Sequence, residues 1–103
     1  MAVVNTSWNG SAARFDDAQW QRSCLVDRGL DFDTAKTRYA VPVKEPNGDL
    51  NSNAVHAAAA VLAGARGGVQ APPAAKKQAA RKLVRLYAML DESPPESLSR
   101  LAG

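Results

Sequence analysis

The chain has 103 residues, which is enough for one domain with a modest hydrophobic core. Its 13 basic and 10 acidic residues give a net charge of +3, and such a low net charge argues against a disordered chain even though Leu, Val and Phe supply only 20 residues. A single Cys excludes an internal disulfide, and no apolar run reaches the length of a transmembrane helix. We also expect no secretory signal peptide, because the N-terminus lacks a basic start and an apolar stretch.

Residues 1–14 predict an extended N-terminal arm, because they are rich in Asn, Ser and Gly. Trp8 is the aromatic side chain of this arm. A tryptophan in such a segment either folds back on the core of its own chain or inserts into a pocket of a partner. The sequence is compatible with both interpretations.

A helix is predicted over residues 16–28. Asp16 is a suitable N-cap, and Gln19 three residues later completes a capping box. Phe15 before the cap and Trp20 inside the helix have the spacing of a hydrophobic staple. The glycine that follows suits the end of the helix.

Extended structure is predicted around residues 38–50, after a loop or single helical turn at 31–37. Alternate apolar residues from Tyr39 to Val43 fall on one face, and Pro42 restricts the segment to the edge of a sheet. A Pro-Asn-Gly-Asp turn follows, around which a short two-stranded ribbon can form.

Two further helices are predicted over residues 53–64 and 73–91, where apolar residues recur at helical spacing. The first carries a narrow stripe of small residues: Val55, Ala58, Ala59 and Leu62. The second carries a broader apolar face: Ala79, Leu83, Leu86, Tyr87 and Leu90. Residues 92–103 are expected to form a tail with at most a short helical turn.

The predicted fold is therefore mainly α with a minor β component (α+β). We expect a small three-helix domain over residues 15–91, preceded by the arm at 1–14 and followed by the tail at 92–103.

Residue patterns typical of enzymes are missing, so no catalytic, cofactor-binding or metal site is predicted. His56 is the only histidine, and no Cys pair accompanies it. Cys24 is expected on a buried face without a neighbouring base, which favours an inert thiol. The glycines at 64–68 lack the Lys and Ser or Thr of a phosphate-binding loop and fit a helix C-terminus better.

Basic side chains are concentrated in the predicted helix 73–91. No acidic residue occurs between Asp49 and Asp91, while five cations fall within ten residues of that window: Lys76, Lys77, Arg81, Lys82 and Arg85. Such a face can neutralise phosphates of a nucleic acid, although a solvated helix face is the more common reason for this pattern. No aromatic residue alternates with these cations, so base stacking is not expected there.

The arm and the start of the first helix supply the candidate residues for binding another protein: Trp8, Arg14, Phe15 and Trp20. Tryptophan is a frequent anchor of protein interfaces, and a core with few large side chains gains stability from a partner.

Three stretches together resemble a small module found in proteins of tailed bacteriophages and prophages of actinobacteria. They are residues 8–15 (WNGSAARF), residues 39–48 (YAVPV followed by PNG) and residues 53–69 (from NAVHAA to RGGV). The module accompanies head-assembly proteins, including prohead-protease-like ones, or stands alone. The resemblance covers residues 8–90 and implies a structural or binding role in a phage head, with no catalytic residue to carry over.

We therefore expect a non-enzymatic, minor head- or capsid-associated component, acting in decoration or assembly, whose partners are other head proteins. Its expected location is the virion or the host cytoplasm, without a membrane partner. The alternative is a nucleic-acid-binding module that contacts DNA non-specifically through the basic helix.

Overall fold

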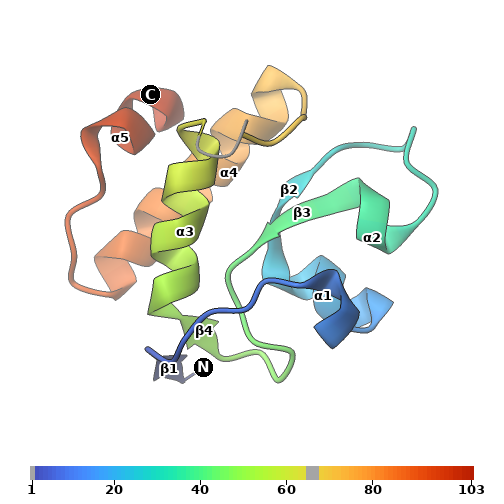
Figure 1. The fold of residues 1–103 in the computed structure, drawn as a ribbon. Coiled ribbons are helices and arrows are strands. Elements are labelled where there is room, and N and C mark those ends of the chain that lie inside the picture. Colours follow the sequence, from blue (N-terminus) through green and yellow to red (C-terminus); the bar gives the residue numbers. More distant parts are fainter. Residues whose placement is uncertain (1, 65–67) are drawn as a thin grey trace.

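Helices dominate residues 2–64 and 68–103, the part of the chain that the computed structural model describes (Figure 1). The helical share is 49% and the strand share is 13%, which confirms the predicted mainly α fold with minor β structure. In chain order the elements are β1 (Val3–Val4), a 3₁₀ turn (Ala12–Arg14), α1 (Asp17–Ser23), β2 (Cys24–Asp27), α2 (Ala35–Arg38), β3 (Tyr39–Pro42), β4 (Leu50–Asn51), α3 (Ser52–Leu62), α4 (Pro73–Met89) and α5 (Glu96–Ala102).

The predicted capping box begins α1. The Asp16 carboxylate accepts a hydrogen bond from the backbone N–H of Gln19 at 2.7 Å, and the Gln19 side chain accepts one from the backbone N–H of Asp16 at 2.8 Å. The buried rings of Phe15 and Trp20 meet edge to face with their centroids 5.3 Å apart. The helix start and the hydrophobic staple are therefore confirmed.

The predicted end of this helix is wrong. α1 stops at Ser23, and the second half of the predicted helix 16–28 is instead strand β2, which pairs antiparallel with β3. Val26 lies opposite Ala40 in this ribbon and is fully buried. Pairing with β3 satisfies the backbone of the segment while β2 packs against α4, so tertiary contacts override the local helical pattern.

Strand β3 confirms the extended segment predicted before the turn. Its partner, however, is β2 and not the chain that follows the turn. Across that turn, a single antiparallel bridge joins Lys44 to Leu50 in the described residues. The predicted single helical turn before β3 is α2.

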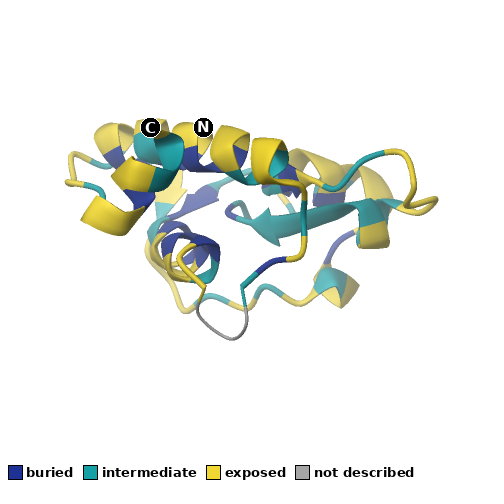
Figure 2. Cartoon of the chain, turned by 90° about the horizontal axis from the view of Figure 1, so that it is seen from above, coloured by how far each residue is buried: buried dark blue, intermediate teal, exposed yellow. Residues whose placement is uncertain are grey.

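α4 is the central helix, in contact with α3, α5 and β2 (Figure 1). The predicted small-residue stripe of α3 is buried in full, and Ala79, Leu83 and Tyr87 of α4 are buried opposite it. Figure 2 shows the buried faces of the helices turned toward the interior. The tail forms α5, two turns long, where at most a short turn was expected, because Leu98 is buried against α4.

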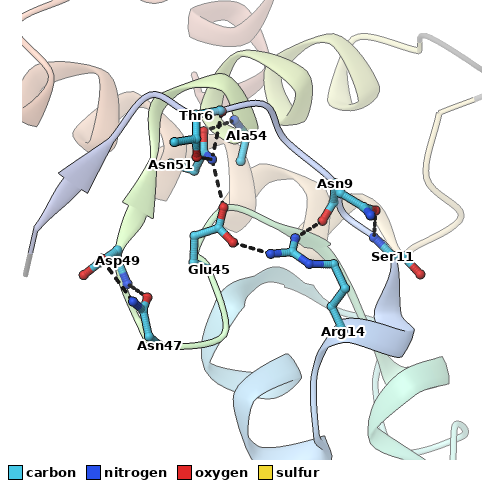
Figure 3. A network of polar contacts seen from close by, with 9 residues as sticks. All are labelled: Thr6, Asn9, Ser11, Arg14, Glu45, Asn47, Asp49, Asn51 and Ala54. Carbon is cyan, nitrogen blue, oxygen red and sulfur yellow. Dashed lines mark hydrogen bonds and ion pairs between the residues drawn. The ribbon is translucent and has the colours of Figure 1, made fainter.

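Asn51 is a buried polar residue that joins three separate segments (Figure 3). Its side-chain oxygen accepts hydrogen bonds from the backbone N–H groups of Asn53 and Ala54, which caps α3. Its side-chain nitrogen donates to the carbonyl of Thr6 in the arm at 3.2 Å and to Glu45 at 3.0 Å. One amide therefore satisfies groups of α3, the arm and the turn after β3.

The arm is held at both ends of its described part, residues 2–14. β1 pairs in parallel with β4, and Arg14 at the other end donates hydrogen bonds to the carbonyl of Asn9 and to Glu45. Burial acts to raise the pKa of Glu45, but the hydrogen bonds from Arg14 and Asn51 outweigh it and leave the pKa below its usual value. Glu45 is therefore ionised at neutral pH, and its carboxylate accepts hydrogen bonds from both Arg14 and Asn51.

Replacing Asn51 by Ala is expected to lower the free energy of unfolding by about 2–4 kcal/mol. The change removes an N-cap worth about 1 kcal/mol and a hydrogen bond to a charged group worth about 1.5–3 kcal/mol. Urea denaturation measures the loss. Asn47→Ala is the matched control, because Asn47 lies exposed in the turn, and it should cost less than about 1 kcal/mol. Equal losses in the two variants would contradict the central role of Asn51.

Stability should also depend on the ionisation of Asp27. The guanidinium of Arg38 binds this carboxylate through two hydrogen bonds, which lowers its pKa to about 2. The pair therefore stabilises the fold above about pH 4 and loses this contribution as the pH falls toward 2. Both side chains are partly exposed, so Asp27→Asn is expected to cost less than about 1 kcal/mol at pH 7, and much less at pH 2, where about half of the folded carboxylates are already protonated. Thermal unfolding at both pH values tests this, and an equal loss at pH 2 would contradict it.

Candidate functional site

Trp8 lines two neighbouring hollows between the arm and α3. The first hollow, of about 350 Å³, lies between the arm, β3, α3 and residues 68–70. The second, of about 650 Å³, lies between residues 8–11 and α3. Trp8, Ala57 and Val61 line both, so we treat them as one site, the Trp8 cleft. The Trp8 ring is half-buried, and it packs on the core while it forms a wall of the cleft.

The other three residues predicted to bind a partner have roles inside the chain. Phe15 and Trp20 are buried, with 4% and 6% of their surface exposed, and the indole N–H of Trp20 donates to the carbonyl of Tyr39. The Arg14 guanidinium lies 5.9 Å from the Trp8 ring centroid and binds Glu45. Of the four, Trp8 and Arg14 therefore keep surface that a partner can reach, while Phe15 and Trp20 are buried inside the chain.

Two features of the Trp8 cleft have no signal in the sequence. Val41 in its wall has a φ of +64°, which is rare for a β-branched residue and costs about 1–3 kcal/mol. Arg28 also lines the cleft, and its Nε is buried without a hydrogen-bond partner in the described residues. A strained wall residue and an unpaired cationic N–H beside apolar side chains are features of a binding site more than of a filled core.

The basic residues of α4 do not form a single face. Nε of Arg81 donates to the carbonyl of Ala102 at 2.9 Å, so Arg81 caps the C-terminal end of α5. Lys82 and Arg85 line a groove of about 340 Å³ that they share with residues of α1 and β2 and with Val43 and Lys44. Lys77 lies about 140° around the helix from Lys82 and does not line this groove.

Two further cations reach the same groove from outside α4. Arg22 comes from α1, and Lys44 comes from the segment between β3 and β4. We call this site the basic groove and define it by Arg22, Lys44, Lys82 and Arg85. Sequence reasoning missed the first two, because nothing in their local pattern indicates that β2 folds back beside α4.

His56 and Cys24 show no catalytic arrangement. Nε2 of His56 lies 2.7 Å from Glu92, and its ring rests beside Tyr87 at the surface. Burial raises the pKa of the Cys24 thiol to about 12, so it is protonated at neutral pH. Within residues 2–64 and 68–103, no three His, Cys, Asp or Glu side chains are placed to hold a metal ion. The glycine turn predicted at 64–68 falls partly outside the described residues.

In the described segments, no helix has both the length and the apolar character needed to cross a membrane. No protein-family model, curated protein or solved structure matches the chain.

The single thiol gives a direct test of the Cys24 environment. With a thiol-specific disulfide reagent at pH 8, the folded protein is expected to react at least about 100-fold more slowly than the protein in 6 M urea, because the folded thiolate fraction is very small. Absorbance of the released thiolate gives both rates. Comparable rates would mean that Cys24 is an accessible nucleophile after all.

Proposed function

We propose that this protein is a non-enzymatic structural component of a tailed-phage head, which attaches to another head protein through the Trp8 cleft. The observation that carries the proposal is a convergence in space. The three stretches that resemble the phage module, residues 8–15, 39–48 and 53–69, all contribute side chains or backbone to this one cleft. They are far apart in the chain and meet where the surface is hollowed.

The chemistry of the cleft favours an extended segment of the partner. Apolar walls from Trp8, Val61 and Val69 suit an apolar side chain. The guanidinium of Arg28 also lines the cleft and suits a carbonyl or carboxylate oxygen next to that side chain.

The arm is a rigid support for such an interface. The arm is ordered when the chain folds, by β1, the Asn51 network and the Arg14 contacts. The Trp8 ring is therefore already in position before a partner binds, and binding does not have to order the arm. Under this proposal the protein works in the virion, or in the host cytoplasm while heads assemble.

Replacing Trp8 by Ala is expected to weaken attachment to heads at least about 10-fold, as for a central tryptophan of an interface. Co-sedimentation of the purified protein with heads that lack it measures the occupancy. Leu30→Ala is the matched control, because Leu30 is 86% exposed and lies outside the cleft, and it should leave attachment unchanged.

A second variant tests the cleft even if Trp8→Ala destabilises the fold. Ala57 is exposed and lines both hollows, so Ala57→Glu places a charge in the cleft while the Trp8 side chain is kept. It should weaken attachment as Trp8→Ala does, with unchanged urea unfolding. Full occupancy for both variants would refute the cleft as the attachment site.

A further inference from the structure

The basic groove gathers four cations from three parts of the chain. Arg22, Lys82 and Arg85 are exposed, and Lys44 is half-buried. Among residues 2–64 and 68–103, none of the four forms an ion pair with a carboxylate. Nε of Arg85 makes a 3.4 Å hydrogen bond to the carbonyl of Arg81, which leaves its charge uncompensated.

An acidic group beside Lys82 is already engaged. Asp27 at the end of β2 lies close enough for Lys82 to contribute to its low pKa, but both of its carboxylate oxygens accept hydrogen bonds from Arg38. The groove is therefore a concentration of positive charge that the fold itself does not neutralise.

We infer that the basic groove binds the phosphate backbone of double-stranded DNA without sequence preference. Four cations around one groove are complementary to closely spaced phosphates, and their association releases condensed counterions. None of the described lining residues is aromatic, so the groove supports backbone contacts and not base stacking. This inference does not depend on the Trp8 cleft, which is lined by other residues.

The salt dependence of binding is the first test. Fluorescence anisotropy with a labelled 20-base-pair duplex, titrated with the full chain between 50 and 200 mM NaCl, gives the affinity at each salt concentration. Four phosphate contacts predict a slope of about −3.6 in a plot of log affinity against log salt. Absence of binding at 50 mM NaCl would overturn the inference. So would equal or tighter binding of polyglutamate in competition, because the groove would then be a site for acidic protein segments.

Matched charge reversals locate the site. Lys82→Glu with Arg85→Glu changes the net charge from +3 to −1 and should weaken binding at least about 10-fold, with a slope smaller by about two. Lys76→Glu with Lys77→Glu makes the same change in net charge on α4 but outside the groove, and it should alter the affinity less than about 3-fold. Equal losses for the two pairs would mean that net charge, and not the groove, governs binding.

A variant of Arg22 distinguishes DNA binding in the groove from DNA binding by the basic residues of α4 alone. Arg22 lies on α1, so Arg22→Gln should weaken binding and reduce the slope by about one only if DNA occupies the groove. This change adds no negative charge at an exposed position, and unfolding in urea confirms that the variant is folded. Unchanged binding by Arg22→Gln would overturn the groove as the site.

Discussion

The buried side chain of Asn51 is the interaction on which the rest of the structure depends. A fully buried amide must have partners for both its oxygen and its nitrogen, and here these partners belong to three segments of the chain: the arm, the turn after β3 and the start of α3. The side-chain oxygen caps the N-terminus of α3, while the side-chain nitrogen donates hydrogen bonds to Thr6 in the arm and to Glu45. Glu45 in turn binds Arg14, whose guanidinium lies 5.9 Å from the Trp8 ring centroid, so this network and the pairing of β1 with β4 together position the Trp8 ring.

The ribbon of β2 and β3 determines where both candidate sites lie. β3 carries Val41 into the Trp8 cleft, and β2 places Cys24 and Leu25 in the basic groove beside α4. The two sites are thus lined by different residues along the same pair of strands.

Local chemistry explains which parts of the fold could be predicted. The capping box at Asp16, the apolar stripes of α3 and α4 and the edge strand before the turn depend on neighbours within a few residues, so their patterns are visible in the sequence. The end of α1 could not be predicted, because Cys24–Asp27 become a strand only when β3 lies beside them. α5 was underestimated for a similar reason, since its stability comes from Leu98 packing on α4.

The sequence by itself determined the mainly helical class, the helix starts, the concentration of cations in α4 and the importance of Trp8 as an unusual residue of the arm. Only the tertiary structure decided what these residues face. It buried Phe15 and Trp20, turned Arg81 toward α5, and added Arg28 to the cleft and Arg22 and Lys44 to the basic groove. The physical reason is that a binding surface is built from side chains distant in the chain, whose proximity results from strand pairing and burial and leaves no periodic trace in the sequence.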